Sequence, residues 1–189
     1  MASVSGSASL REILRTQTAA SHESLDALFG TLDLGEREDF ARFLSAHYIG
    51  LSALYPLYHA FVADELAMEP PPYPAMLRRD LAAMGRDAAH LPTISPGGDL
   101  DPLAVTYVLA GSRLGLTMLA RKNYWGRRDA RAAVYMDDTE GMAVWRSLLA
   151  KMAEPHPDAE AQARIVASAN DAFAVFRHAF ELSAAEARS

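Results

Sequence analysis

The chain contains no cysteine, which excludes disulfides, zinc–thiolate centres, iron–sulfur clusters and cysteine nucleophiles. It also lacks a positive net charge, since 18 Lys and Arg residues against 24 Asp and Glu residues give −6 at pH 7. No overall basic field is therefore available to attract nucleic acid or an anionic membrane. Uninterrupted apolar runs long enough to span a bilayer are missing, and so is a basic N-terminal region followed by an apolar stretch. We expect no membrane span, no signal peptide and a cytoplasmic location.

Strand signals are also scarce, because Val and Ile residues are scattered and no run alternates cleanly between apolar and polar residues. Apolar residues instead recur at helical spacing along most of the 189 residues, and 50% of the chain is hydrophobic. These patterns predict an all-α protein with a single domain of about seven or eight helices over residues 9–187. The Ser- and Ala-rich residues 1–8 are expected to form a flexible N-terminus.

Local signals predict where the helices begin and end. Ser9 and Glu12 have the spacing of a capping box, and Asp101 followed by Pro102 is typical of a helix N-terminus. Pro56 is expected to kink or divide the helix that contains it. The expected helices cover about residues 10–29, 36–66, 75–85, 101–122, 139–153 and 157–186, and the segments 90–100 and 123–129 are expected to be irregular.

Two glycines, Gly111 and Gly115, lie one turn apart in the very apolar helix 101–122. Each costs about 1 kcal/mol of helix propensity relative to alanine. Their spacing indicates that something approaches this helix backbone closely, and a neighbouring helix is the most frequent reason for such a pair.

His22 is the candidate metal ligand. It follows Arg15 by two helical turns, roughly 10 Å along one helix face at 1.5 Å per residue. Asp26 follows His22 by four residues, within reach of one imidazole nitrogen. An imidazole oriented by a carboxylate, with a cation two turns away, suits a metal with an anionic periphery, as in haem. The alternative is a surface histidine or a hydrogen-bonded core histidine.

Several stretches, taken in order, resemble the haem oxygenases, specifically the compact bacterial type associated with bacterial phytochromes. The resemblance spans nearly the whole chain. The stretches are "LRTQTAASHESLD", "FARFLSAHYIGLSALYPLYHAF", "RRDLAAMG" followed by "HLP", "YVLAGSRLG", "YMDDTEGMAVWRSLLAKM" and "ANDAFAVFRHAFEL". The resemblance implies a multi-helical bundle that holds haem between the first, proximal helix and a distal helix kinked at its glycines.

The resemblance also implies roles for individual residues. His22 would bind the haem iron as a neutral imidazole, and Asp26 would be its acidic partner. Arg15 matches a basic position that meets a haem propionate. Arg146, next to a tryptophan in "VWRSLL", falls near a second such position.

On the distal side, Gly111 and Gly115 would lie over the haem and crowd the ligand of the iron toward a meso carbon. Two neighbouring positions depart from the family pattern. Many relatives have a carboxylate where this chain has Ser112, which can order water but supplies a proton less readily. Relatives commonly have a small residue where this chain has Leu116, and we expect the leucine to press on the haem or shift the helix.

The implied activity is oxidative cleavage of haem b, both substrate and cofactor, to biliverdin, CO and ferrous iron with O2 and external electrons. Implied partners are a ferredoxin-type or other electron donor and a bacterial phytochrome that receives biliverdin. The departures at Ser112 and Leu116 keep open a non-catalytic haem- or bilin-binding protein on the same scaffold. Thiamine-degrading and cofactor-processing enzymes also use such helical bundles, so the fold alone does not decide the function.

Other residues receive simpler interpretations. His47 and His59 are twelve residues apart, too far for a second metal site on one straight helix. Arg113 is expected on a solvated helix face rather than at a propionate. The basic segment 121–131 is either a solvated loop or a docking patch for an acidic electron donor. An aromatic stripe at helical spacing is expected in the core and consists of Phe173, Phe176 and Phe180.

Overall fold

The computed structural model describes residues 8–122, 124–128, 132–154 and 158–186. Most of the expected N-terminal segment 1–8, part of the basic segment 121–131 and residue 187 lie outside the described residues. Within the described part of the chain, all regular secondary structure is helical and no strand occurs. The all-α prediction is therefore confirmed.

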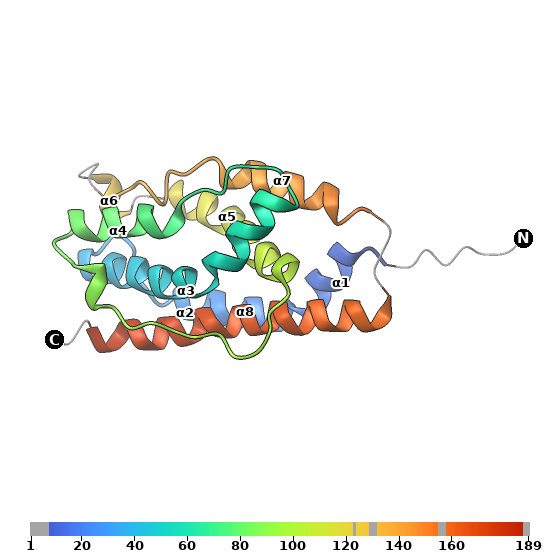
Figure 1. Ribbon diagram of the computed structural model, residues 1–189. Helices are drawn as coiled ribbons and strands as arrows, with labels where there is room; N and C mark the ends of the chain where they lie inside the picture. Colours follow the sequence, from blue (N-terminus) through green and yellow to red (C-terminus); the bar gives the residue numbers. More distant parts are fainter. Residues whose placement is uncertain (1–7, 123, 129–131, 155–157, 187–189) are drawn as a thin grey trace, which may run out of the picture.

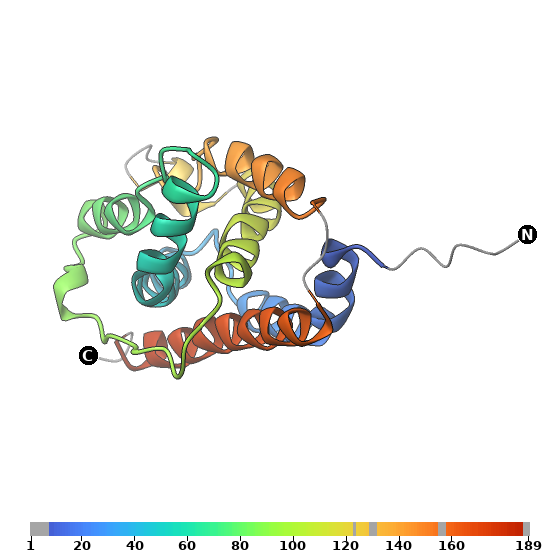
Figure 2. The same ribbon diagram turned by 45° about the vertical axis from the view of Figure 1, so that its right-hand side comes forward.

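The two longest helices, α3 and α8, have 28 residues each and pack against one another, and α5 packs on both of them and on α7 (Figure 1). Figure 2 shows α5 rising from α8 toward α7, while α2 runs along α8. The helices in the described residues are α1 (Leu10–Gln17), α2 (Ala19–Phe29), α3 (Arg37–Asp64), α4 (Tyr73–Ala83), the 3-10 helix η1 (Ala88–His90), α5 (Pro102–Ala120), α6 (Trp125–Arg128), α7 (Gly141–Lys151) and α8 (Ala159–Glu186).

The first helix begins at the predicted capping box but is divided, which corrects the prediction of one helix over 10–29. Thr18 adopts φ −107° and ψ 2°, outside the regular helical range. Its backbone N–H and its hydroxyl both donate to the carbonyl of Leu14, at 2.9 and 2.8 Å. Because the break lies between Arg15 and His22, the two residues do not share one continuous helix face.

Pro56 does not divide α3, which continues from Arg37 to Asp64. In Figure 1 the second half of α3 turns away from the direction of the first half. Proline lacks the N–H that would bond to the carbonyl of Ser52, and its ring crowds that carbonyl, so a bend is the expected result. Of the two predicted outcomes, the structure therefore has the kink.

The segment 123–129 was expected to be irregular, yet it contains the short helix α6. Gly126 allows α6 to pack closely, because a Cβ at this position would collide with the carbonyl oxygen of Ala132 and with the Phe40 ring. The glycine is thus a requirement of close packing as well as a helix-breaking signal in the sequence.

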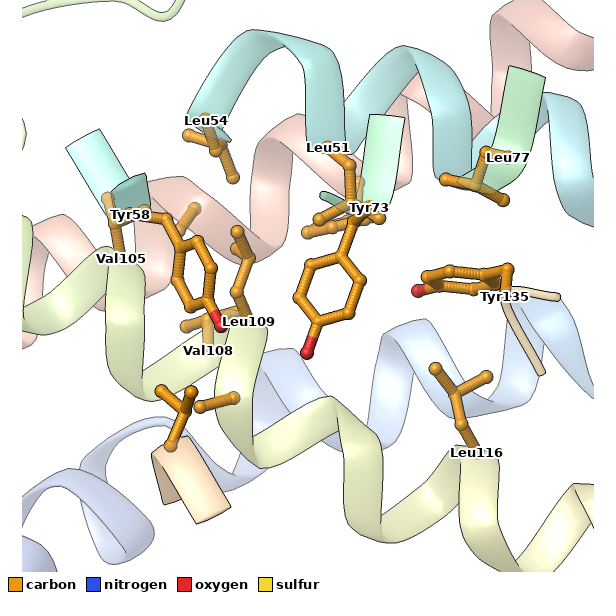
Figure 3. Close-up of a cluster of buried hydrophobic side chains, with 14 of the residues drawn as sticks. Leu51, Leu54, Tyr58, Tyr73, Leu77, Val105, Val108, Leu109, Leu116 and Tyr135 are labelled. Atoms are coloured by element: carbon orange, nitrogen blue, oxygen red, sulfur yellow. The ribbon is translucent and has the colours of Figure 1, made fainter. Parts of the chain in front are cut away.

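The core lies between α3, α4, α5 and α8. Figure 3 shows part of it, with Leu51 and Leu54 from α3, Tyr73 and Leu77 from α4 and Leu109 from α5. Helix α5 is long and apolar enough to cross a membrane by length and composition, but its apolar residues supply this core. The predicted aromatic stripe on α8 is also buried, and consists of Phe173, Phe176 and Phe180.

His47 on α3 is buried among aromatic rings that include Phe29 of α2 and Tyr135, with centroids 4.8 and 5.6 Å away. Its Nδ1 lies 2.9 Å from the carbonyl oxygen of Phe43. Burial, together with the Arg113 guanidinium, lowers the pKa of His47 from 6.5 to about 4, although the hydrogen bond to Phe43 opposes the shift.

This depressed pKa predicts a specific pH dependence of stability. The unfolded chain binds a proton at His47 below pH 6.5, whereas the folded chain binds it only near pH 4. The free energy of unfolding is therefore expected to fall by up to about 3 kcal/mol between these values as pH decreases. Urea denaturation of the His47→Gln variant should show a flatter dependence over this window. His178→Gln, which replaces an exposed imidazole, is the control and should behave like the unmodified chain; equal slopes for all three proteins would contradict the prediction.

Candidate functional site

Two contacts link the segments of the chain that contain α2 and α5. Near their beginnings, burial raises the pKa of the Tyr107 hydroxyl, and the adjacent Thr18 side chain partly offsets this rise. Beyond their ends, the N–H of Trp125 donates to the carbonyl of Leu34 at 2.8 Å. Both helices rest on α8 but make little direct contact with one another.

The first link lies one helical turn before a candidate residue on each helix. His22 follows Thr18 by four residues, and Gly111 follows Tyr107 by four residues. At 1.5 Å per residue, each lies about 6 Å along its own helix beyond this link. The link therefore ties the beginning of α2, which carries His22, to the part of α5 that precedes Gly111.

On the α2 side, Nδ1 of His22 lies 3.0 Å from Oδ2 of Asp26, which confirms the contact predicted from their spacing. The edge of the imidazole meets the ring of Phe173 on α8, with centroids 5.7 Å apart. The His22 side chain is 56% exposed. Within the described residues Nε2 has no hydrogen-bond partner, and none of the residues of α2 is buried.

Helix α8 holds the junction between α1 and α2 just before His22. The Ser21 hydroxyl donates to Oδ1 of Asn170 at 2.6 Å, and Nδ2 of Asn170 donates to the Gln17 carbonyl at 3.5 Å. Sequence reasoning missed this contact because Ser21 and Asn170 are 149 residues apart. The contact positions the first turn of α2, and with it the imidazole.

On the α5 side, the face around Gly115 is open. A Cβ placed on Gly115 would meet no atom within 4 Å. Leu114 and Met118 flank it with 45% and 62% of their surface exposed, the large apolar side chains that are most accessible in the described part of the chain. A glycine between exposed apolar side chains is typical of a surface that accommodates an apolar ligand.

The two distal glycines differ in their surroundings. A Cβ on Gly111 would lie 3.4 Å from the ring of Trp145 on α7, which therefore covers this glycine. The Trp145 ring also lies 5.7 Å from the ring of Tyr107. Ser112 is half-buried, and its hydroxyl donates to the carbonyl of Leu109 at 2.8 Å.

Four other predicted residues are placed as follows. Leu116 is buried in the core near Tyr135 (Figure 3), so its bulk is not on the open face of Gly115, contrary to expectation. Arg113 is buried, not solvated, and pairs with Asp138. Arg15 and Arg146 are exposed on α1 and α7. Burial raises the pKa of Tyr107, and the Arg11 and Arg15 guanidinium groups partly offset this rise, which indicates that Arg15 lies near the first link between α2 and α5.

The described residues hold no group of three or more His, Asp or Glu side chains suited to binding a bare metal ion. His22 is instead a single candidate ligand with one free nitrogen. Such a ligand fits a metal that brings its remaining ligands with it, as the iron of a porphyrin does.

No family model and no curated protein matches this sequence. The structure nevertheless defines the class, because the chain has the haem oxygenase fold. It is similar to the NO- and CO-bound haem oxygenase from Neisseria meningitidis, with a TM-score of 0.75, 19% sequence identity and 94% of each chain covered. The fold expected from the resemblance of the sequence is therefore confirmed.

The open space at Gly115 predicts the effect of adding a methyl group. Gly115→Ala should stabilise the ligand-free protein by about 0.5–1 kcal/mol, because alanine favours the helix and meets no neighbour. Gly111→Ala is the matched comparison and should gain less, because its methyl group would lie against Trp145. Urea denaturation measures both effects, and a loss of stability in Gly115→Ala would show that this face is not open.

Proposed function

We propose that this chain is a haem oxygenase that binds haem b between α2 and α5. One observation carries the proposal: α2 has an exposed imidazole and no buried residue, and α5, which is linked to it through Thr18 and Tyr107, has an open glycine between exposed apolar side chains. The haem oxygenase fold supports the same assignment.

The residues of α2 fit the iron. With Asp26 accepting a hydrogen bond from Nδ1, the neutral imidazole of His22 carries its lone pair on Nε2, which is free to bind the metal. The carboxylate also fixes the orientation of the ring and raises the basicity of the ligand nitrogen. The Phe173 ring also lies against the imidazole, with the two rings edge to face.

The residues of α5 fit the porphyrin plane. Gly115 lets the helix backbone approach a flat ligand, and Leu114 and Met118 supply apolar contacts. In a chain of net charge −6, the anionic propionates require individually placed cations, and we assign this role to Arg15 and Arg146.

When bound, haem supplies the redox chemistry, and with O2 and external electrons it is converted to biliverdin, CO and ferrous iron. The chain orients the ring through His22 and crowds its distal face with the backbone of Gly111 and Gly115. The hydroxyl of Ser112 donates to Leu109, so its oxygen remains an acceptor for an ordering water. We further propose a ferredoxin-type donor, a phytochrome as recipient of biliverdin and a cytoplasmic location.

A second candidate function is a non-catalytic haem or bilin binder. Ser112 favours it, because a hydroxyl stands where many haem oxygenases have a carboxylate. Leu116 no longer supports it, since its side chain is buried in the core and leaves the open face free.

Haem binding is tested by titrating the purified chain with hemin and recording the Soret band. We expect saturable one-to-one binding that is lost or strongly weakened in His22→Ala, because the axial ligand is removed. His178→Ala is the matched control, since His178 is also an exposed helical histidine with an acidic neighbour, Glu181 at 3.6 Å. Equal binding by both variants would rule out His22 as the ligand.

Turnover separates the two candidate functions. Haem-loaded protein is supplied with ascorbate or reduced ferredoxin under air, and absorbance and CO release are followed. For a haem oxygenase we expect the Soret band to decay while a red-absorbing bilin and CO appear. A Soret band that persists, or that bleaches without formation of a bilin, would contradict haem oxygenase activity. The non-catalytic binding protein would then be the remaining candidate function.

A further inference from the structure

A buried ion pair lies on the side of α5 that faces the core. Nη2 of Arg113 is 3.3 Å from Oδ2 of Asp138, and the two side chains are 3% and 2% exposed. The same nitrogen donates to the carbonyls of Tyr135 and Asp138, at 2.9 and 3.2 Å. Taking both charges out of water is unfavourable, so a buried pair of this kind is weak evidence for stability and suggests a role in geometry.

Two tyrosine rings enclose the guanidinium of Arg113. Its Cζ lies 4.8 Å from the ring centroid of Tyr135 and 5.2 Å from that of Tyr73 on α4. The rings themselves meet edge to face, 5.8 Å apart at 88°. With its head group held by rings and carbonyls, Arg113 restrains rotation of α5 about its own axis.

Asp138 also positions α7. Its carboxylate accepts hydrogen bonds from the backbone N–H groups of Glu140 and Gly141, both at 3.1 Å, at the start of the helix. Gly141 is pressed against the cluster, because a Cβ there would collide with the Tyr73 hydroxyl and lie 2.7 Å from Cγ of Arg113. Trp145, the residue that covers Gly111, follows Gly141 by one helical turn.

We propose that the Arg113–Asp138 pair is a positioning device for the distal face. The pair fixes the rotation of α5 about its own axis relative to the first turn of α7. It thereby determines how the Trp145 ring lies over Gly111. Under the proposed function, on which this inference rests, the pair determines the shape of the distal side of the haem site, although neither residue reaches that site.

The first test uses the haem-free full chain in a Trp125→Phe background, where Trp145 is the remaining tryptophan. Asp138→Asn keeps the volume and one of the two capping oxygens but leaves the Arg113 charge unpaired. Arg113→Met combined with Asp138→Asn removes that charge, and neutral replacement of a buried pair is usually tolerated. Glu160→Gln, which breaks the exposed pair with Arg164 at 3.1 Å, is the matched control.

In both Asp138 variants we expect Trp145 emission to shift to the red and acrylamide quenching to increase severalfold, with unchanged values in Glu160→Gln. A wild-type Trp145 signal in the folded double variant would overturn the proposal, since the pair would then serve stability alone. If neither Asp138 variant folds, Arg113→Lys decides, because it retains the charge but not the planar guanidinium that lies between the two tyrosine rings. A wild-type Trp145 signal in Arg113→Lys would then overturn the proposal.

The second test uses haem-loaded protein with CO and measures the infrared stretching band of the bound CO. The double variant is expected to shift or broaden this band while its hemin titration curve stays close to wild type, because the His22 side is untouched. An unchanged band together with an unchanged Trp145 signal would overturn the positioning role. Failure of the unmodified chain to bind haem would reject the proposed function but leave the Trp145 result intact.

Discussion

The links that hold α2 beside α5 at both ends are the constraint on which the candidate site depends. Tyr107 lies beside Thr18 at one end, and Trp125 donates to the carbonyl of Leu34 at the other. Between these links the helices rest on α8 without packing on each other. The separation between the two helices is therefore maintained by the surrounding chain and not by packing of α2 on α5.

Helix α5 performs two tasks on opposite faces. One face is part of the core, where Leu116, Leu109 and Arg113 are buried. The other face carries Gly115 and two exposed apolar side chains. Rigid attachment on the core side is what allows the exposed side to keep its shape without a protein neighbour, which is the usual arrangement of a preorganised site.

Much of the fold was predictable because it depends on local signals. The capping box of Ser9, the N-cap of Asp101 and the apolar helical spacing are all confirmed by the structure. The His22–Asp26 contact was predictable for the same reason, since residues four apart on a helix are neighbours.

The errors have a common physical origin in long-range contacts. Arg113 was expected to be solvated because its neighbours in sequence do not reveal Asp138, 25 residues away, or the two tyrosine rings. The division of the first helix at Thr18 and the support of α2 by Asn170 likewise depend on tertiary structure. Gly111 and Gly115 were expected to be equivalent, and only the position of Trp145 on α7 distinguishes them.

The absence of buried residues from α2, within the described structure, has a consequence for the dynamics of the chain. A helix with few buried contacts belongs to the part of a protein that opens locally at low free energy, so its amide protons exchange early. A ligand held between α2 and α5 would bind the closed form alone and would suppress this opening by mass action. Under the proposed function, local folding of α2 and ligand occupancy are thus thermodynamically linked.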